Sequence, residues 1–361
     1  MIQKPDAPLP AGGAVKVRDR EGRLVGTGFF NPRAELALRM FSDGEVRDVG
    51  EHFANRLEES VGLRETVLGL GKVTDAFRLV HAEGDGFPGL ILDKLGDAIV
   101  GQVASLGMLR CLDPLGEWLL RRYPKTKLVL LQDKDWAERE GMERLPRPQA
   151  VHTQVREHGI VYEVTAGAGH KTGFFADQRD NRLLLRQFAK GRRVLDLCCN
   201  SGGFALNAIA GGAKEVIAAD LDEAMVAQTE TNAKANRMKL TAVHGDAFEL
   251  LRALRGDEHD LIVLDPPKWV HHKDELETGL VRYADLNRLG IEKVARGGIV
   301  VTCSCSGSVS EEQFVRTLRD AAAAARRDVR VLALRGAGGD HPIALECLET
   351  RYLKVAVLQV R

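Results

Sequence analysis

The chain has 361 residues, of which 44% are hydrophobic and 28% are charged, a composition typical of a globular protein with two or three domains. Its 51 basic and 51 acidic residues balance, which excludes the whole-chain basic excess of simple nucleic-acid coat proteins. The sequence contains neither a signal-peptide core nor an uncharged apolar run of membrane-spanning length, so we expect a cytoplasmic protein with no membrane partner. Thiols stay reduced in that compartment, and the 6 cysteines are expected to be buried small side chains or reactive thiols rather than disulfides.

Three regions of different character follow one another along the chain. Residues 1–47 contain short alternating segments separated by turn residues, which predict a small β module. Residues 48–160 begin with a helical pattern over 49–64 and continue with strand-like and helical segments, which predict a mixed α/β domain. Residues 161–361 are more regular, because apolar strand-like runs alternate with helical stretches throughout.

The third region predicts a doubly wound, largely parallel sheet. In such a sheet the ligand binds beyond the carboxyl ends of the strands, so the residues that end each strand are candidates for function. The apolar runs are RRVLDL, KEVIAAD, LTAVHGDA, DLIVLDPP, GGIVVTCSC, VRVLAL and YLKVAVLQV.

Acidic and small residues gather where the first three of these strands end. The first strand runs into the turn CCNSGGF, whose small residues would let backbone N–H groups approach a ligand closely. This turn contains Gly202 and Gly203 but lacks the GxGxxG pattern of dinucleotide-binding proteins. The second strand ends in Asp220, a suitable acceptor for a ribose diol, and the third leads to Asp246. A single Asp after a strand is commonly a helix cap, but polar residues at three successive strand ends favour a ligand site.

The fifth strand ends in VTCSCSG (Val301–Gly307), where two cysteines stand two residues apart. A CxC pair offers too few ligands for zinc, and no histidine lies beside it at ligand spacing, so no metal site is predicted. In a regular strand both side chains point to the same face about 6.6 Å apart, with Cys303 one pleat deeper than Cys305. An isolated cysteine in such a place is commonly a buried thiol, so the neighbouring strand ends have to decide between packing and chemistry.

Taken together, DLCCNSGGF, Asp220, GDAF, DPPK and SCSG resemble the class I S-adenosylmethionine-dependent methyltransferases, and specifically the RlmI-like 23S ribosomal RNA cytosine-5 methyltransferases. GFFNP and LALRM resemble part of a PUA domain that lacks the basic first strand of its relatives, so this module is expected to be truncated. KTGFFADQRDNR (Lys171–Arg182) and ETRYLK match later segments of the family. The resemblance implies a Rossmann-like methyltransferase domain, S-adenosyl-L-methionine as cofactor, and 23S ribosomal RNA, free or partly assembled, as partner.

The resemblance also implies roles for individual residues. Asp177 and Gln178 match the segment that closes over the cofactor. Asp220 matches the ribose-binding acid, and Asp246 matches the residue near the adenine. The two cysteines of the CCN turn are expected to pack beneath the cofactor loop. The complete set of implied cofactor-binding residues is Asp177, Gln178, Asp196, Ser201, Gly202, Gly203, Asp220, Asp246 and Asp265.

The chemistry of this family explains the need for a thiol and a carboxylate. Carbon 5 of cytosine is too weak a nucleophile to take a methyl group from a sulfonium, but a thiolate added at carbon 6 turns the ring into an enamine that can. Cys305 fits the nucleophile, and Asp265, in DPPK after the fourth strand, fits the group that orients the base. Because these strands are neighbours in the usual sheet order, Cys305 is expected opposite Asp265. Lys268 and His341 are the substrate-binding candidates, a turn cap fits His341 equally well, and the base that removes the carbon 5 proton is unassigned.

Two alternatives remain open at this point. An RNA guanine or adenine N-methyltransferase of the same fold would use (D/N)PP followed by an aromatic residue that stacks on the base, whereas here Lys268 stands in that place and Trp269 follows. That displacement favours carbon methylation. The alternative from a different class is a non-catalytic RNA-binding assembly factor, which the presence of Asp220, Asp265 and Cys305 disfavours. The sequence determines neither the modified nucleotide nor the oligomeric state, with a homodimer among the arrangements considered.

Overall fold

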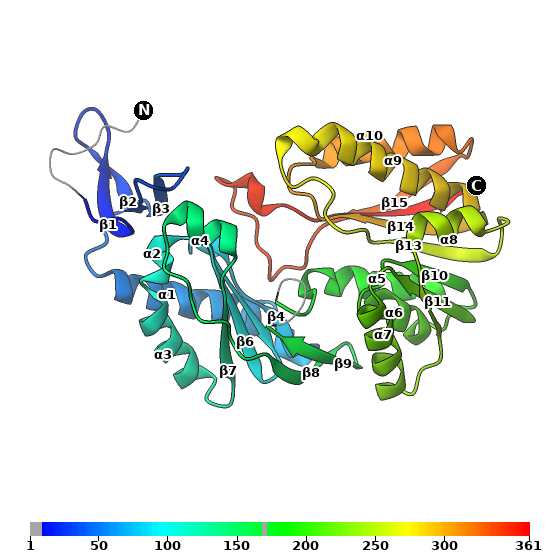
Figure 1. Ribbon diagram of the computed structural model, residues 1–361, viewed down its shortest axis with the longest axis horizontal. Coiled ribbons are helices and arrows are strands. Elements are labelled where there is room, and N and C mark those ends of the chain that lie inside the picture. The colour runs from blue at the N-terminus through cyan, green and yellow to red at the C-terminus, as the bar shows by residue number, and fades with distance from the viewer. Residues whose placement is uncertain (1–8, 168–171) are drawn as a thin grey trace. The chain divides into compact units, whose positions relative to one another are not determined.

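A computed structural model describes residues 9–167 and 172–361 (Figure 1). The first eight residues of the predicted β module, and Lys171 at the start of KTGFFADQRDNR, therefore lie outside the described residues. None of the helices within the described residues is long and apolar enough to cross a membrane. The chain divides into two units, the first made of residues 1–156, 164–176 and 339–350, and the second of residues 157–163, 177–338 and 351–361.

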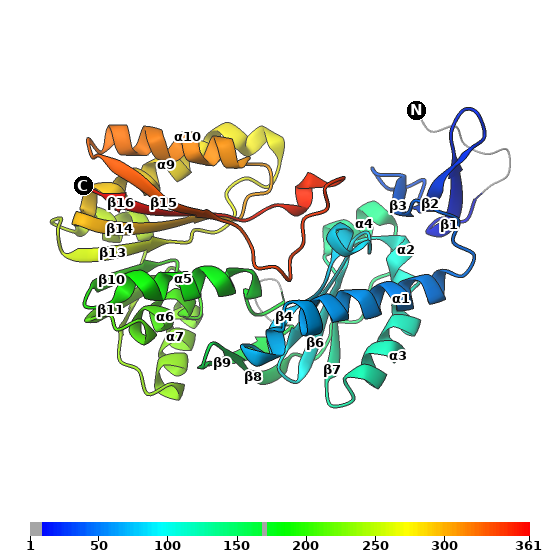
Figure 2. The ribbon, with the colours of Figure 1, turned by 180° about the vertical axis from the view of Figure 1, so that it is seen from behind.

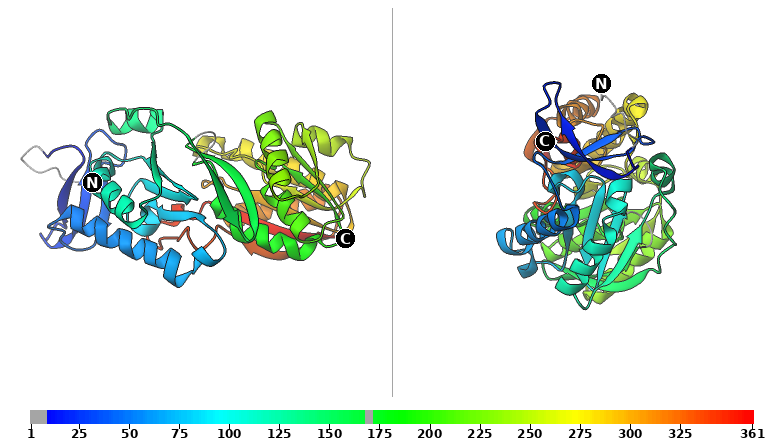
Figure 3. Two further views of the ribbon diagram at one scale, coloured as in Figure 1. Left: turned by 90° about the horizontal axis from the view of Figure 1, so that it is seen from below. Right: turned by 90° about the vertical axis from the view of Figure 1, so that its left-hand side faces the viewer.

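The amino-terminal part of the first unit is an antiparallel sheet in residues 13–42, drawn in dark blue in Figure 3. β1 alternates strictly between half-buried and exposed side chains, so one of its faces contributes to packing. Phe29 and Phe41, from the other two strands, join the hydrophobic core of the first unit. The strands, in spatial order, are β1 (Gly13–Arg18), β2 (Leu24–Phe30) and β3 (Leu38–Ser42).

The rest of the first unit is built on a sheet in residues 76–131, ordered β4-β5-β6-β7. β4, β5 and β6 are antiparallel neighbours, and β7 runs parallel to β6 after a helical crossover. Helix α1 begins after its N-cap Asp48 and buries Phe53, Leu57 and Val61 at helical spacing. Figure 2 shows α1 and α3 side by side on this sheet. The bounds are α1 (Val49–Gly62), η1 (Leu63–Val67), η2 (Leu70–Lys72), β4 (Ala76–His81), η3 (Ala82–Asp85), β5 (Leu90–Leu95), β6 (Ala98–Val103), α2 (Leu106–Leu109), α3 (Leu112–Arg122), β7 (Lys127–Leu131) and α4 (Lys134–Glu140).

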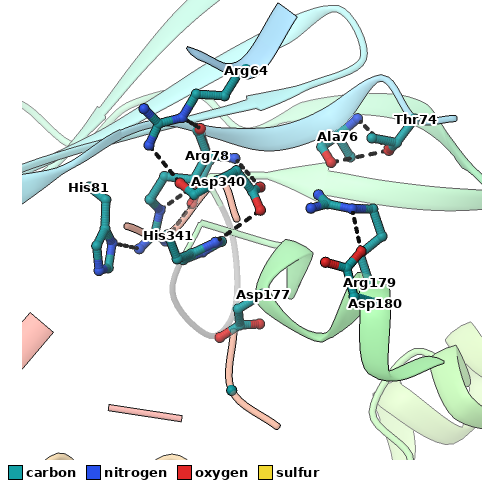
Figure 4. Close-up of polar contacts among 12 residues, drawn as sticks. Arg64, Thr74, Ala76, Arg78, His81, Asp177, Arg179, Asp180, Asp340 and His341 are labelled. Carbon is teal, nitrogen blue, oxygen red and sulfur yellow. Dashed lines mark hydrogen bonds and ion pairs between the residues drawn. The ribbon is translucent and has the colours of Figure 1, made fainter. Parts of the chain in front are cut away.

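Arg64, in the helical turn η1 after α1, is a fully buried cation. Its guanidinium donates two hydrogen bonds of 2.7 Å to the carboxylate of Asp85. It also donates to the carbonyl oxygen of Asp340 at 2.6 Å (Figure 4). The Asp340 carboxylate in turn accepts from the backbone N–H of Arg78 at 3.0 Å. These contacts explain why the segment 339–350, remote in sequence, belongs to the first unit.

A second buried ion pair joins Arg78 to Asp93, through hydrogen bonds of 2.8 and 3.0 Å. One ring nitrogen of His81 lies 3.0 Å from the same guanidinium, and the His81 ring packs against that of His341, with 5.2 Å between the centroids. Burial, followed by the charges of Arg78 and His341, lowers the pKa of His81 to about 3. The His81 imidazole is therefore neutral near pH 7, and its nitrogen accepts from Arg78.

We expect Arg64→Met to destabilise the first unit by about 3–5 kcal/mol, because it leaves the buried Asp85 carboxylate without its cation. The matched control is Arg56→Met on α1, where the ion pair with Glu59 is exposed and is worth under about 1 kcal/mol. Urea unfolding followed by circular dichroism measures both changes. Equally small losses in the two variants would mean that the buried pair does not stabilise this unit.

A hairpin of β8 (Val151–Glu157) and β9 (Ile160–Ala166) follows. Its turn residues His158 and Gly159 both have positive φ, 47° and 82°, as a type I′ turn requires. Glu157 beside this turn is fully buried and belongs to the second unit. Its carboxylate accepts two hydrogen bonds from the Arg182 guanidinium, at 2.7 and 2.6 Å, so this buried charge is paired within the unit.

The second unit contains a doubly wound sheet in residues 193–360, and all seven predicted apolar runs are strands of it. The spatial order is β12-β11-β10-β13-β14-β16-β15. Neighbouring strands are parallel from β12 to β14, whereas β16 lies antiparallel between β14 and β15. The predicted α/β fold with a mostly parallel sheet is confirmed. The bounds are β10 (Arg193–Leu197), β11 (Glu215–Asp220), β12 (Thr241–His244), β13 (His259–Leu264), β14 (Val294–Ser304), β15 (Val329–Arg335) and β16 (Lys354–Val360).

Helices cover both faces of this sheet, with α8, α9 and α10 on one side and α5 and α6 on the other (Figure 1). One core contains Tyr283 of α9 and Phe314 of α10, and the other contains Leu185 of α5 and Phe204 of α6. Between residues 176 and 324 the bounds are η4 (Ala176–Gln178), α5 (Arg179–Ala189), α6 (Gly203–Ala210), α7 (Glu223–Ala235), α8 (Ala247–Ala253), η5 (Lys273–Glu275), α9 (Leu276–Lys293) and α10 (Glu311–Ala324). The short helical turn η6 (Leu348–Thr350) belongs to the first unit.

Candidate active site

The order of the strands defines a switch point between β10 and β13. From β10 the chain continues outward through β11 to β12 on one side, and through β13 to β14 on the other. The loops after β10 and β13 therefore leave in opposite directions, and a crevice at the carboxyl ends of these strands is the usual ligand site of such a sheet. Pairing of Leu197 with Leu264 makes β10 and β13 end level with each other.

The loop after β10 is a tight turn that leads directly into α6. Cys198, Asn200 and Gly202 have positive φ, at 58°, 49° and 81°. A Cβ on Gly202 would lie 2.8 Å from the Thr229 side chain, and one on Gly203 would lie 2.9 Å from the Arg182 side chain, so both positions require glycine. The turn thus has glycine where a close backbone approach to a ligand is predicted, without the GxGxxG pattern, and the approach itself stays a prediction.

Asp196 is fully buried within β10. Its Oδ2 accepts from the backbone N–H of Ala205 at 2.8 Å, which ties the strand to the first turn of α6. Its Oδ1 has no hydrogen-bond partner among the described residues. The carbonyl oxygen of Ser201 accepts from the Asn232 side chain at 2.9 Å, so the loop backbone is held by α7.

Asp220 ends β11, Asp246 lies two residues after the end of β12, and both carboxylates hold backbone groups. The Asp220 carboxylate accepts from the N–H of Asn200 at 2.8 Å and from that of Asp222 at 2.9 Å, one at each oxygen. Asp246 is the N-cap of α8 and accepts from two N–H groups of its first turn. A carboxylate oxygen has more than one acceptor position, so the Asp220 carboxylate remains able to accept hydroxyl groups.

The segment that begins at η4 reaches the end of β13. Gln178 is buried, and its Nε2 donates to the Asp265 carboxylate at 3.1 Å. Its Oε1 accepts from the Asn181 side chain at 2.8 Å, so the amide is held from both ends. The Asp177 carboxylate accepts from the Tyr352 hydroxyl at 2.6 Å. The predicted closing segment and the predicted base-orienting acid are therefore in direct contact.

Carboxylates from successive strand ends surround the loop after β10. Burial raises the pKa of the Cys198 thiol, and four carboxylates raise it further. Burial also raises the pKa of Asp196 well above its usual range, with Asp265 and Asp220 adding to the effect. Like charges gathered in a partly buried place disfavour one another and favour a cationic ligand. The four carboxylates are those of Asp196, Asp220, Asp246 and Asp265.

The two cysteines of VTCSCSG differ in exposure as the strand geometry predicts. Cys303 is fully buried in β14, and Cys305, the first residue after that strand, is partly exposed. Burial, followed by the charge of Asp265, raises the pKa of the Cys303 thiol well above its usual range. Cys303 is therefore a protonated core thiol near neutral pH. Cys199 of the CCN turn is likewise buried in a hydrophobic core, as expected.

The register between β13 and β14 corrects one expectation. Leu264 pairs with Thr302, so one residue further Asp265 comes level with Cys303. Cys305 lies two residues beyond that level and is not directly opposite Asp265. The physical reason is that β14 continues to Ser304 against β16 after its pairing with β13 has ended.

The loop after β14 is held by residues to which the sequence patterns assigned no role. The Ser306 hydroxyl lies 3.0 Å from the Tyr283 hydroxyl and accepts from the Val270 N–H at 3.2 Å. The Ser306 carbonyl oxygen accepts from the Lys354 ammonium at 2.6 Å. One signal was visible in the sequence, because Lys354 is the lone charge in the apolar run YLKVAVLQV.

The two predicted substrate contacts are in different units. Lys268, in DPPK after β13, is exposed in the second unit. His341 belongs to the first unit and is buried, with its Nδ1 3.3 Å from the Asp340 carboxylate. The structure therefore brings together the predicted cofactor and catalytic residues of the second unit, whereas contact of His341 with a substrate stays a prediction.

The residues present fit S-adenosyl-L-methionine. This molecule carries a sulfonium and an ammonium, both cationic, and the strand ends supply a cluster of carboxylates. The buried Oδ1 of Asp196 has no partner among the described residues, and glycines replace side chains at the start of α6. Asp220 presents acceptors suited to the ribose hydroxyls.

Comparisons with known proteins agree with this geometry. A family model of S-adenosylmethionine-dependent methyltransferases matches residues 126–329, and a model of a PUA-like domain matches residues 1–43. Ribosomal RNA large subunit methyltransferase I of Tolumonas auensis is 35% identical over 99% of this chain and 93% of its own length. The protein of the same name from Erwinia tasmaniensis is 34% identical over 95% of this chain and 89% of its own length. The solved structure of SMU.776, a methyltransferase complexed with SAH, covers 98% of this chain and 93% of its own chain with a TM-score of 0.82 at 22% identity.

The sheet order and the matching family model define a methyltransferase that uses S-adenosyl-L-methionine as its cofactor. Its amino-terminal part is PUA-like. Within this class, the chain belongs to the family of ribosomal RNA large subunit methyltransferase I. The likeness to the solved structure, at 22% identity, shows the shared fold.

We expect Asp220→Asn to weaken binding of S-adenosyl-L-methionine by about tenfold or more, because hydrogen bonds to a charged acceptor are worth about 1.5–3 kcal/mol each. Isothermal titration calorimetry measures the affinity. The matched control is Asp222→Asn, the same change at an exposed N-cap two residues away, which should bind as the unchanged protein does. Equal affinity in the unchanged and Asp220→Asn proteins would remove this residue from the cofactor site.

Proposed function

We propose that the protein forms 5-methylcytidine in 23S ribosomal RNA, with Cys305 as the nucleophile and Asp265 as the group that orients the base. The observation that carries the proposal is a partly exposed thiol directly after β14, with a carboxylate directly after the neighbouring parallel strand β13. The name of the relatives, ribosomal RNA large subunit methyltransferase I, supports RNA of the large subunit as the substrate.

The chemistry assigns each step to a residue of this chain. When bound, S-adenosyl-L-methionine supplies an electrophilic methyl group. The Cys305 thiolate adds to carbon 6, which forms a C–S bond and makes carbon 5 nucleophilic enough to be methylated. Asp265, held by Gln178, binds the N3 and N4 edge of the base and favours the adduct. Loss of the carbon 5 proton to a base and expulsion of the thiolate restore the aromatic ring.

The buried state of Cys303 supports a single attacking thiol. It has no exposed surface and its pKa is raised, so at neutral pH it is a protonated thiol out of reach of a base. The target atom inside a stacked duplex is equally out of reach, so we propose that the cytosine is unstacked or flipped before it meets Cys305. Lys268, exposed after β13, is the proposed contact to the RNA backbone.

The packing of Trp269 disfavours the N-methyltransferase alternative. Its ring stacks on Phe248 with 5.9 Å between the centroids and lies 4.8 Å from the ring of Tyr283. The Arg282 guanidinium covers it at 5.1 Å from the centroid. An aromatic side chain that is occupied in this way does not serve as a stacking platform for a target base.

We expect Cys305→Ala to lower methylation of ribosomal RNA by about 10³-fold or more, because the adduct cannot form without the nucleophile. The same variant should give no denaturant-resistant adduct with RNA that contains 5-fluorocytidine, in which the departing proton is replaced by fluorine. Methylation is measured by mapping 5-methylcytidine, and the adduct by gel shift under denaturing conditions.

The matched control is Cys303→Ala, which removes the neighbouring thiol and should retain both methylation and adduct formation. Neither variant should accumulate adduct on ordinary RNA. Trapping of Cys303→Ala on ordinary RNA would mean that the two thiols share the reaction, and an active Cys305→Ala would refute the cytosine-5 function.

Cofactor binding distinguishes a methyltransferase from a non-catalytic assembly factor. Such a factor would bind RNA but would have no need of the cofactor. The unchanged protein should bind S-adenosyl-L-methionine in a calorimetric titration, and failure to bind would favour the assembly role.

A further inference from the structure

Lys354 is a buried lysine at the start of β16. Its exposed fraction is 2%, and the strand that follows, VAVLQV, is almost entirely apolar and buried. Lysine is rarely buried to this extent, because removing an ammonium from water is costly unless an anion or several acceptors compensate. Acceptors or an anion must therefore compensate the burial of the Lys354 ammonium.

The antiparallel pairing of β14 with β16 determines where this ammonium lies. Lys354 pairs with Ser304, the last residue of β14, so it stands beside the point where the chain leaves the sheet. Its Nζ donates to the carbonyl oxygen of Ser306 at 2.6 Å and to that of Tyr352 at 2.8 Å. Within the described residues, these hydrogen-bond acceptors are neutral, and no carboxylate forms an ion pair with Lys354. Hydrogen bonding alone therefore leaves the charge without a counter-ion.

The charged and titratable groups around Lys354 come from the start of its own strand and from three neighbouring elements. They are Cys305 after β14, Glu311 at the start of α10, Arg351 before β16, and Lys268 after β13. Glu311 is already paired with Arg351. Of the two groups here that can carry a negative charge, a thiolate at Cys305 would have the larger influence on the buried ammonium.

The interaction between these two groups is reciprocal. Burial lowers the pKa of Lys354 to about 8, and the Cys305 thiolate is the largest influence in the opposite direction. If a thiolate at Cys305 favours the ammonium form of Lys354, then by thermodynamic linkage the ammonium favours the thiolate by the same free energy. A cation beside a cysteine is a common means of lowering a thiol pKa in proteins.

We propose that Lys354 is a positioning residue that stabilises the thiolate of Cys305. Its hydrogen bond to the carbonyl oxygen of Ser306 also holds the backbone directly after Cys305 in place. The meaning of this arrangement for catalysis rests on the proposed cytosine-5 function. The thiolate is the form that adds to carbon 6 and the form that is expelled at the end of the reaction. A fixed cation beside it serves both steps, and the two hydrogen bonds to carbonyl oxygens keep that cation in place.

The test measures the thiolate in the absence of RNA. Iodoacetamide reacts with a thiolate, forming an S–C bond and releasing iodide, so the alkylation rate follows the thiolate fraction. The rate at Cys305 is followed against pH by site-resolved mass spectrometry, in the full-length protein. Cys303, which has no exposed surface, serves as the internal control for intact folding and should stay unlabelled.

In Lys354→Met we expect the midpoint of Cys305 alkylation to rise by about one pH unit, which lowers the rate about tenfold below both midpoints. Lys354→Arg keeps the charge and should retain a midpoint close to that of the unchanged protein. The matched control is Lys293→Met. Lys293 is the last residue of α9, and its ammonium also donates to a backbone carbonyl oxygen, that of Leu254. It should leave the midpoint unchanged. If labelling of Cys303 shows that Lys354→Met is unfolded, Lys354→Gln provides the same comparison.

The proposal would be overturned if the alkylation midpoint of Cys305 were unchanged in folded Lys354→Met or Lys354→Gln. It would also be overturned if Lys293→Met raised that midpoint by the same amount. The outcome is separable from that of the proposed function. A raised midpoint in a protein that does not methylate cytosine would support the role of Lys354 and refute the cytosine-5 function. An unchanged midpoint in a protein that forms 5-methylcytidine would do the reverse.

Discussion

The parallel pairing of β10 with β11 and β13, and of β13 with β14, is the constraint on which the site depends. Parallel strands end at the same edge of a sheet, so residues that directly follow them are brought together although they are far apart in sequence. Here these residues include carboxylates, whose negative charges repel one another. A ligand with a sulfonium and an ammonium relieves that repulsion, which links the architecture of the sheet to the choice of cofactor.

The antiparallel strand β16 brings its first residues to the edge of the sheet where the parallel strands end. β16 lies between β14 and β15 and runs in the opposite direction, so it begins where β14 ends. Its first residue, Lys354, therefore stands beside the loop that carries Cys305, and Tyr352 just before it bonds to Asp177. The return strand thus connects the segment of Asp177, the loop of Cys305 and a buried cation.

Two of the buried ion pairs in this protein join segments that are separated in the sequence. Arg64 with Asp85 holds the segment that contains Asp340 in the first unit, and Arg182 with Glu157 holds α5 to the β8–β9 turn in the second. Buried ion pairs are weak sources of net stability compared with apolar packing, but loss of one partner is costly. Their placement at junctions favours a role in defining which segments lie together.

The sequence by itself determined the seven strands of the sheet, the identity of the strand-end residues and the order of burial of Cys303 and Cys305. Apolar runs and the two-residue period of a strand depend on local pattern, which the sequence contains in full. It did not determine the register between β13 and β14, which brings Cys303 rather than Cys305 level with Asp265. It also did not reveal that Lys354 lies beside the loop of Cys305 or that Gln178 bonds to Asp265. Register, strand insertion and side-chain contacts between distant segments depend on the packing of the whole sheet and its helices, so only the tertiary structure decided them.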